Sequence, residues 1–385
     1  MRLSVDMAEL SQSDIRSMSI ECDKLGGLNL SQGICDLETP AQVIAGAKRA
    51  MDSGNNHYTR YDGIQPLRQA ISNKLRTFNG VAADPDGEIV VSAGATGALF
   101  CAALALLRPG DEVVLFEPYY SYHLHTLLAI GATPVFVRTN PPDWKFDLAY
   151  LEKAISKKTR GIIINTPSNP SGKVFTKEEL SQIAELCQKH DLIVFTDEIY
   201  EHFVYDGNKH ISPASLSALK DRTVTISGYS KVFSITGWRI GYSACREDWA
   251  MAIGQINDLL YVCAPAPLQA GVADGIEKLP SSFYSSISTA YEKKRDKICD
   301  ALDDAGLHPH VPQGAYYVLA DSASLQGGGS KEKAMNLLRK ARVAAVPGRA
   351  FYHDKQGDGL LRFCFAKEDS DIAQACDRLR LLKGD

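Results

Sequence analysis

The stretch TVTISGYSKVFSITGWRIGYSA, residues 223–244, contains two short apolar runs separated by a polar turn that carries Lys231. Residues 223–226 and 239–244 are rich in β-branched and aromatic side chains, which favour strands. Open α/β sheets bind their ligands beyond the carboxyl ends of strands. The turn that holds Lys231 is therefore a candidate site.

The same alternation of short β-rich runs and longer helical stretches extends from about residue 90 to 245. We expect further strands at 88–91, 112–116, 134–137, 161–165 and 192–196, and a helix at 177–190. Strands that alternate with helices build a parallel sheet with helices on both faces. The sequence therefore predicts an α/β fold with a large domain around a mostly parallel sheet.

The C-terminal part of the chain predicts a smaller α+β unit. A turn at 279–282 is followed by a charged helical pattern at 288–305, and then by strands at 316–319 and 361–365 and helices at 331–341 and 370–381. A chain of 385 residues exceeds the usual size of a single hydrophobic core. We expect a large ligand-binding domain at 41–285 and a small domain at 286–385, with an N-terminal segment at 1–40 that contributes to the small domain.

The composition is that of an ordinary soluble globular protein, with 45% hydrophobic residues, 23% charged residues and a net charge of -4. The chain contains no run rich in Lys and Arg, which argues against a nucleic-acid partner. The apolar run 98–107 is too short to span a membrane, and Asp6 and Glu9 do not fit a secretory signal. Nine cysteines without a C-x-x-C pair predict reduced thiols and no zinc site. We expect a cytoplasmic protein without a metal.

Polar residues follow three successive predicted strands. The strings NTPSNPSG at 165–172 and DEIY at 197–200 occupy two strand ends, and Ser227 to Lys231 follow the third. Alone, these are an ordinary turn, helix cap and solvated lysine. Together they bring an amide, a carboxylate and an amine to one crevice, with Arg239 eight residues beyond Lys231.

These strings resemble the class I and II aminotransferases of pyridoxal 5'-phosphate (PLP) fold type I. The similarity rests on N-x-P-x-N-P-x-G, D-E-I-Y and S-K-V-F-S-I-T-G-W-R-I-G, and it continues in the expected order at 29–33, 58–63, 94–98, 117–120, 347–348 and 361–362. It therefore covers nearly the whole chain. The segment from Asn169 to His210 most resembles the kynurenine, glutamine and methionine aminotransferase branch.

The resemblance implies three catalytic residues. Lys231 would hold PLP as a Schiff base, and its freed amine would then move the proton at the substrate α-carbon. Asp197 would pair with the pyridine nitrogen and keep it protonated. Tyr200, together with Asn169, would donate hydrogen bonds to the phenolic oxygen of the ring.

The phosphate of PLP requires positive charge and backbone amides. Arg239 can supply a bidentate guanidinium. Some relatives carry a phosphate-binding serine where this chain has Gly228, so Ser230 or Ser227 takes that role, and we favour Ser230. The remaining amides are expected at the N-terminus of an apolar helix, from Gly94, Ala95 and Thr96.

Two tyrosines are assigned by the same resemblance. Tyr120 resembles the residue that stacks on the cofactor ring, although an aromatic residue after a strand often only packs in the core. Tyr58 resembles a residue that reaches the cofactor phosphate of the neighbouring subunit, which implies a homodimer. Tyr61 is the alternative for this role.

The substrate carboxylate is expected at Arg362, which lies on a predicted strand where a buried guanidinium needs an anion. A structural salt bridge is the alternative. Asn169 would also contact substrate, and Gly33 would allow close approach of a backbone amide. Thr96 carries no charge at a position where aspartate-specific relatives have lysine, which argues against strong dicarboxylate selectivity. The branch that the segment from Asn169 to His210 resembles favours neutral aromatic or sulfur-containing amino acids, so these are the expected donors.

The resulting hypothesis is a ping-pong aminotransferase that alternates between PLP and pyridoxamine phosphate while it moves an amino group from an L-amino acid to a 2-oxo acid. A PLP-dependent carbon–sulfur β-lyase on the same scaffold is the main alternative. A non-catalytic PLP-binding regulator is a weaker one. A dinucleotide-dependent oxidoreductase is disfavoured because residues 94–97 lack the full G-x-G-x-x-G pattern.

Overall fold

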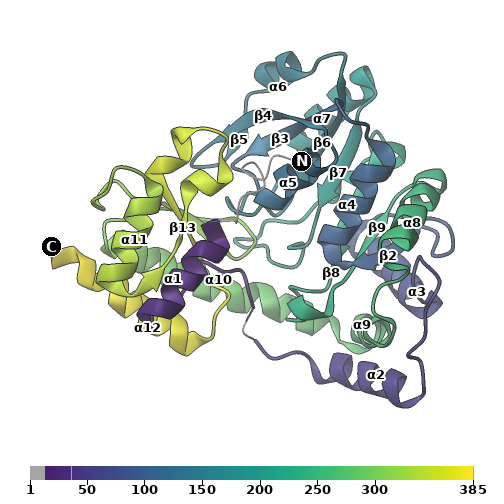
Figure 1. Ribbon diagram of the computed structural model, residues 1–385, viewed down its shortest axis with the longest axis horizontal. Coiled ribbons are helices and arrows are strands. Elements are labelled where there is room, and N and C mark those ends of the chain that lie inside the picture. The colour runs from purple at the N-terminus through teal and green to yellow at the C-terminus, as the bar shows by residue number, and fades with distance from the viewer. Residues whose placement is uncertain (1–13, 36, 385) are drawn as a thin grey trace, which may run out of the picture.

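A computed structural model describes residues 14–35 and 37–384 of the chain (Figure 1). Its main sheet has eight strands, and the strands from β8 to β4 pair in parallel, whereas β9 is antiparallel to both of its neighbours and β5 is antiparallel to β4. The predicted mostly parallel sheet is confirmed. In spatial order the strands are β2 (Ile89–Ala93), β9 (Ile240–Ala244), β8 (Thr223–Gly228), β7 (Ile193–Asp197), β6 (Thr159–Asn165), β3 (Glu112–Glu117), β4 (Thr133–Asn140) and β5 (Lys145–Phe146).

Helices cover both faces of this sheet because alternate side chains of each strand point to opposite sides. Leu115 packs in the apolar cluster of α4 (Gly94–Leu106) and α8 (Glu247–Tyr261), and its neighbour Val114 packs with α7 (Lys177–His190). The expected helix at 177–190 is confirmed, and it begins with a capping box between Thr176 and Glu179. The other helices of this part are α2 (Ala41–Asp52), α3 (Gln65–Lys74), α5 (Ser121–Ala129), α6 (Leu148–Ala154) and α9 (Ala266–Lys278).

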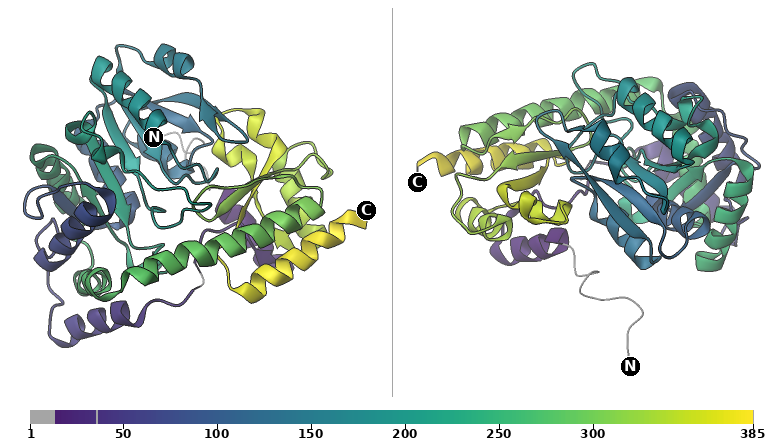
Figure 2. Two further views of the ribbon diagram at one scale, coloured as in Figure 1. Left: turned by 180° about the vertical axis from the view of Figure 1, so that it is seen from behind. Right: turned by 90° about the horizontal axis from the view of Figure 1, so that it is seen from above.

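The C-terminal part forms an antiparallel sheet flanked by helices (Figure 2). Its strand order is β10 (Pro309–His310), β11 (Tyr317–Asp321), β14 (Leu360–Cys364) and β13 (Val346–Pro347), and its helices are α10 (Ser281–Asp304), α11 (Ser330–Ala341) and α12 (Asp369–Arg380). The predicted α+β unit is therefore present.

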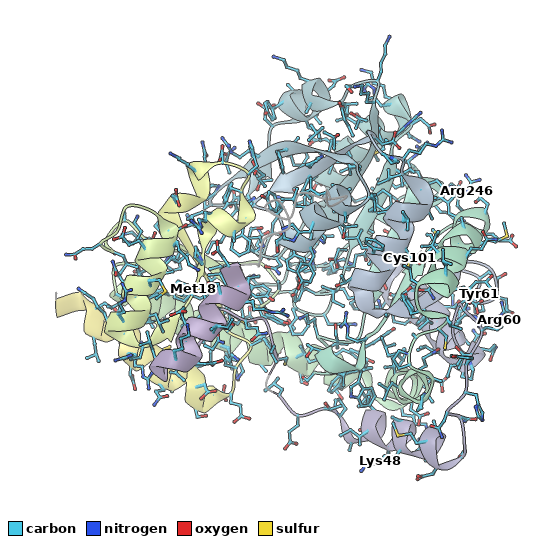
Figure 3. The ribbon with its side chains drawn as sticks, viewed as in Figure 1. Met18, Lys48, Arg60, Tyr61, Cys101 and Arg246 are labelled. Atoms are coloured by element: carbon cyan, nitrogen blue, oxygen red, sulfur yellow. The ribbon has the colours of Figure 1, made fainter. Side chains whose placement is uncertain are left out.

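The N-terminal segment joins this C-terminal unit. β1 (Leu28–Asn29) pairs in parallel with β12 (Val343–Ala344). Helix α1 (Asp14–Leu25) lies beside α11 and β13, and its buried residue Met18 is drawn among the C-terminal elements, away from Cys101 on α4 (Figure 3). The described part of this segment thus contacts the C-terminal unit, while the assignment of 1–40 to the small domain stays a prediction. Residues 1–13, with Asp6 and Glu9, lie outside the described part.

Helix α10 begins at Ser281, seven residues before the predicted start at 288. Residues 281–287 are rich in serine, a weak helix former, so the sequence pattern understates this helix. Figure 2 shows α10 running from beside the main sheet to the C-terminal unit. The predicted domain division at 285/286 thus falls within a helix, and the division itself stays a prediction.

Three further features bear on the sequence predictions. The strand expected from 239 begins at Ile240, because Arg239 has a left-handed backbone with a φ of 56°. All nine cysteines are free thiols, as expected for a chain without a disulfide framework. Across residues 14–35 and 37–384, no helix is both long enough and apolar enough to cross a bilayer.

Candidate active site

A cavity of about 480 Å³ lies at the carboxyl ends of β6, β7 and β8, where the main sheet meets the C-terminal unit. Side chains from both parts of the chain line it. All of the predicted site residues except Gly94 and Tyr58 are among its lining residues: Gly33, Ala95, Thr96, Tyr120, Asn169, Asp197, Tyr200, Ser230, Lys231, Arg239 and Arg362.

Lys231 lies in the turn after β8, and its partly buried side chain lines the cavity. Its Nζ donates a hydrogen bond to the Gly33 carbonyl oxygen at 3.0 Å. Burial disfavours the charged ammonium and lowers the pKa of Lys231 to about 8. A substantial fraction of this amine is therefore neutral and nucleophilic near physiological pH.

Asp197 ends β7, and both of its carboxylate oxygens are held. His123 Nε2 lies 2.8 Å from Asp197 Oδ2, and the Ile199 backbone N–H donates to Asp197 Oδ1 at 3.2 Å. The Asn165 side-chain amide donates to the Asp197 backbone carbonyl at 3.0 Å. This network fixes the direction in which the carboxylate faces the cavity. His123 was not predicted as a site residue, because it comes from α5, 74 positions earlier in the chain.

Tyr200 and Tyr317 form a buried hydroxyl pair with an O–O distance of 3.0 Å. Burial raises the pKa of Tyr200 well above its ordinary value and the pKa of Tyr317 to about 12, so both phenols keep their protons. A Cβ on Gly33 would lie 1.8 Å from the Tyr317 hydroxyl oxygen. Glycine is therefore required at position 33 by Tyr317, a residue that sequence reasoning had placed only on a strand.

Arg362 on β14 is 1% exposed and is oriented by neutral groups. Its Nη1 donates to Asn169 Oδ1 at 2.9 Å and its Nη2 donates to the Ser31 carbonyl oxygen at 2.6 Å, while its buried Nε has no hydrogen-bond partner. The guanidinium also stacks over the ring of Tyr317 at 4.3 Å. No carboxylate of the described residues pairs with Arg362, which argues against a structural salt bridge. A buried guanidinium without a carboxylate partner instead favours a role in binding an anion.

Arg239 lies beside the N-terminus of α4. Its guanidinium donates to the Thr236 carbonyl oxygen at 2.9 Å, and a Cβ on Gly94 would lie 2.3 Å from its Nη2. Gly94 therefore contacts Arg239 directly, although it is not a lining residue. The first-turn N–H groups of a helix are free to bind an anion, and this helix end brings them next to a guanidinium.

The two serine candidates for an anion site are separated by their contacts. Ser230 lines the cavity. Ser227 Oγ is buried and donates to the Glu198 carbonyl oxygen at 3.3 Å, and it is not among the lining residues. This arrangement favours Ser230, as the sequence reasoning did.

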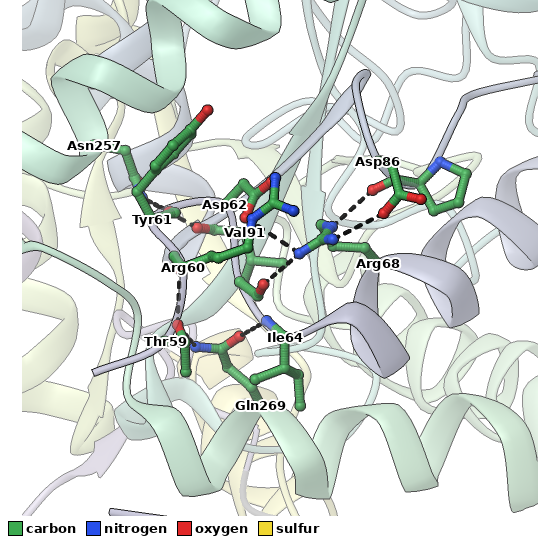
Figure 4. Close-up of polar contacts among 12 residues, drawn as sticks. Thr59, Arg60, Tyr61, Asp62, Ile64, Arg68, Asp86, Val91, Asn257 and Gln269 are labelled. Carbon is green, nitrogen blue, oxygen red and sulfur yellow. Dashed lines mark hydrogen bonds and ion pairs between the residues drawn. The ribbon is translucent and has the colours of Figure 1, made fainter. Parts of the chain in front are cut away.

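Tyr120 lines the cavity with its ring edge-on to His123, at a centroid distance of 5.4 Å. Tyr58, in contrast, is 83% exposed and lies outside the cavity. The loop that follows Tyr58 is anchored by buried polar groups, because the Asn257 amide donates to the Tyr61 carbonyl oxygen at 2.6 Å and Gln269 accepts from the Ile64 N–H (Figure 4). Tyr58 is thus held at the surface of its own subunit.

Three metal-type ligands, Glu198, Glu201 and His210, are not among the lining residues of this cavity, and their ligand atoms lie within 4.8 Å of one another. His210 Nε2 lies 2.7 Å from Glu198 Oε2, and Lys74 Nζ forms an ion pair with Glu201. The ammonium group already supplies a cation to this cluster, so a structural ion network explains it. The expectation of no metal stays a prediction.

Comparison with known proteins identifies the class. Residues 26–379 match the family model of class I and II aminotransferases. Kynurenine–oxoglutarate transaminase 3 of Rattus norvegicus is 36% identical over 378 residues, which cover 90% of this chain and 83% of that protein. The chain therefore belongs to the class I and II aminotransferases, a family that uses PLP, and the predicted resemblance to the kynurenine transaminase branch is confirmed.

Two solved structures match over almost their entire length. N-succinyldiaminopimelate aminotransferase from Mycobacterium tuberculosis has a TM-score of 0.95 at 33% identity, with 99% of this chain and 100% of that chain covered. YbdL from Escherichia coli, which has a methionine aminotransferase function, has a TM-score of 0.95 at 30% identity with the same coverage. The predicted fold type I architecture and the assignment as an aminotransferase are thereby confirmed.

The residues of the cavity fit PLP chemically. PLP needs an amine for its aldehyde, an anion for its ring nitrogen, a donor for its phenolic oxygen, and cations with amides for its phosphate. Lys231, Asp197, Tyr200 and Arg239 supply these groups in one cavity, with the last of them beside the N-terminus of α4. The buried and unpaired Nε of Arg362 leaves a further donor for a carboxylate.

Proposed function

We propose that this protein binds PLP at Lys231 and transfers the amino group of a neutral aromatic or sulfur-containing L-amino acid to a 2-oxo acid in a ping-pong cycle. The observation that carries the proposal is that Lys231 lines one cavity together with Asp197 and Arg362. An amine, a carboxylate and a carboxylate-binding guanidinium are the groups that the reaction needs.

Bound PLP would withdraw electrons from the substrate α-carbon and store the amino group between the two half-reactions. Lys231 would hold the cofactor through Nζ, and after substrate displaces it, the neutral amine would take a proton from the α-carbon and return one to the cofactor side. Its pKa of about 8 suits both tasks. Asp197, held by His123, would keep the ring nitrogen protonated through its negative charge.

The remaining residues would bind and orient. Arg362 would bind the substrate α-carboxylate in a bidentate manner, and the hydrogen bond to Asn169 would fix the plane of the guanidinium. Tyr200 would donate to the phenolic oxygen, and Tyr120 would stack on the ring. The phosphate would lie among Ser230, Arg239 and the first turn of α4, where Gly94, Ala95 and Thr96 present their amides.

Apolar side chains support the choice of a neutral donor. Ile15, Ile34, Leu99 and Ile199 line the cavity, and Thr96 contributes no charge. Burial of an apolar substrate side chain against such a wall contributes about 25 cal/mol per Å². Kynurenine and methionine appear in the names of two relatives, which is in keeping with a donor of this kind.

The active unit is proposed to be a homodimer in which Tyr58 completes the neighbouring site. Tyr58 is exposed and lies outside the cavity of its own chain, on a loop that Asn257 and Gln269 anchor from within. Tyr61 is less suited to this role, because its ring packs against Gly254 of α8, where an added Cβ would lie 2.3 Å from Tyr61 Cε2.

The test is a panel of L-amino acids, each paired with 2-oxoglutarate or pyruvate as acceptor, with oxo-acid formation as the readout. A single turnover with the donor alone should release one equivalent of oxo acid and no ammonia. Catalytic release of pyruvate and ammonia from cysteine conjugates would instead assign a carbon–sulfur β-lyase. Protein that stays colourless after PLP addition would reject the proposed function altogether.

A further inference from the structure

Ser227 is a candidate from the sequence that the proposed function does not use. It lies on β8, is fully buried, and is not among the lining residues of the cavity. Its hydroxyl oxygen lies 3.2 Å from Glu201 Oε1 and 3.3 Å from the Glu198 carbonyl oxygen, and its single hydrogen is shared between these two acceptors. Both acceptors belong to the turn that follows β7, so this hydroxyl joins the ends of two neighbouring strands (Figure 1).

The two joined strand ends carry the groups on which the proposed chemistry depends. Asp197 ends β7 and Tyr200 lies in the turn after it, whereas Lys231 lies in the turn after β8. Backbone pairing of the two strands ends at Asp197 and Ile226, where the Glu198 N–H donates to the Ile226 carbonyl oxygen at 2.8 Å. Beyond that point the spacing between the carboxylate and the amine depends on side chains that hold the two turns together.

The carboxylate that accepts from Ser227 is itself fixed by a buried network. Glu201 forms an ion pair with Lys74 of α3 and accepts from Asn79 Nδ2 at 2.8 Å, and Lys74 Nζ also donates to the Tyr242 hydroxyl at 3.3 Å. Burial alone would raise the pKa of Glu201, but the Lys74 ammonium lowers it to about 2, so the carboxylate stays ionised. An ionised carboxylate only accepts hydrogen bonds, so the donor in this contact must be Ser227.

A hydrogen bond to an ionised acceptor is stronger than one between neutral groups, and this one spans the two segments that hold the reactive groups. We propose that Ser227 is a positioning residue that fixes the spacing between Asp197 and Lys231, and that it does not bind the cofactor phosphate. This proposal rests on the proposed function and gives a role in the same reaction to a residue outside the cavity. Proton transfer depends steeply on such spacing, since a misplacement of about 1 Å can reduce a rate by about 10²-fold.

The first test is the donor half-reaction of holoenzyme carrying Ser227→Ala, at saturating L-methionine, followed by the change in cofactor absorbance. Its rate should fall about tenfold, because a displacement of a few tenths of an ångström is enough for a loss of that size. Ser243→Ala is the matched control and should stay within about twofold, because Ser243 is also fully buried, lies opposite Ile226 on β9, and its hydroxyl has no hydrogen-bond partner among the described residues. A Ser227→Ala enzyme with a lower melting temperature but an unchanged rate would overturn the proposal.

The affinities for PLP and for pyridoxal, which lacks the phosphate, separate positioning from phosphate binding. Ser227→Ala should change both affinities by the same factor, because both ligands meet the same turns. A loss of affinity for PLP alone, with unchanged affinity for pyridoxal, would place Ser227 at the phosphate and overturn the proposal.

A double-mutant cycle tests whether Ser227 acts through its contact with Glu201. Glu201→Gln keeps an acceptor oxygen but removes the negative charge, so it should weaken the same contact and slow the donor half-reaction. The rate of the double variant should fall by less than the product of the two single losses, because the second change acts on a contact that is already broken. Losses that multiply would show that the two residues act independently and would contradict the proposal. A wild-type enzyme that forms no Schiff base with PLP would instead reject the proposed function, so the two failures are distinguishable.

Discussion

The hydroxyl oxygens of Tyr200 and Tyr317 lie 3.0 Å apart in the floor of the cavity. If the Tyr200 hydroxyl donates its hydrogen bond to the phenolic oxygen of the cofactor, then the Tyr317 hydroxyl must donate the hydrogen bond between the two tyrosines. Hydrogen bonds in such a chain polarise and strengthen one another. Tyr317 also stacks on Arg362, so one side chain touches both the predicted cofactor site and the predicted carboxylate site.

Replacement of Tyr317 by Phe should therefore make Tyr200 a weaker donor. The loss of one hydrogen bond, about 0.5–1.5 kcal/mol, should raise the pKa of the bound cofactor by up to about one unit, because its ionised phenolic oxygen is less stabilised. The measurement is a pH titration of cofactor absorbance. Tyr205→Phe removes a buried hydroxyl that donates to the Ala315 carbonyl away from the cavity, and it should leave this titration unchanged. A Tyr317→Phe titration that overlays the wild type would disprove the relay.

Asp197→Asn tests the negative charge that the proposed function assigns to the ring nitrogen of the cofactor. The amide keeps the shape of the side chain and can still accept from the Ile199 N–H, but it cannot hold a positive charge opposite it. We expect kcat to fall by about 10²–10³-fold, the size of effect seen when one preorganised electrostatic group is removed. Covalent capture of PLP at Lys231, measured by absorbance after removal of free cofactor, should persist. Asp191→Asn, at a side chain that is 90% exposed, should retain full activity.

The sequence predicted those parts of the site that depend on local order along the chain. Lys231 and Asp197 could be found because each lies at or shortly after the carboxyl end of a strand that is visible in the sequence. His123 and Tyr317 could not be found, because His123 meets Asp197 from 74 positions away and Tyr317 meets Tyr200 from 117 positions away. Such contacts depend on how the helices and the second sheet pack, which no local pattern encodes.

The fold, like the site, was predicted only in those parts that have a clear local pattern in the sequence. The parallel core was recognisable because Val and Ile runs alternate with amphipathic stretches, and α7 spans 177–190 as predicted. The start of α10 was not recognisable, because its first residues are rich in serine, which has a low helix propensity, and the helix there is stabilised by packing. Arg16, which also lines the cavity, was not predicted as a site residue because the N-terminal segment has no motif, and only the docking of α1 brings it there.

The depressed pKa of Lys231 predicts a specific pH dependence for cofactor capture. Only the neutral amine attacks the aldehyde, and burial lowers the pKa of Lys231 to about 8. The rate of PLP capture by cofactor-free protein should rise about tenfold per pH unit below pH 8 and level off above it. The control is the reaction of PLP with Nα-acetyl-lysine, whose ε-amine is free, and it corrects for titration of the cofactor itself. The midpoint of the control reaction should lie near pH 10.4. A midpoint for the protein near that of the free amine would show that Lys231 is not desolvated.

The role of Tyr58 across a dimer can be tested by subunit complementation. Tyr58→Phe removes a hydroxyl from an exposed side chain, so folding should be unaffected and PLP affinity should fall by about 10-fold, as expected for one hydrogen bond to a charged group. In a mixed dimer with a Lys231→Ala subunit, one site combines an intact Lys231 with an intact Tyr58 from its neighbour. That site should regain wild-type affinity, measured by titration with PLP at limiting concentration. A mixed dimer that keeps the weakened affinity would place Tyr58 in the site of its own chain or in none.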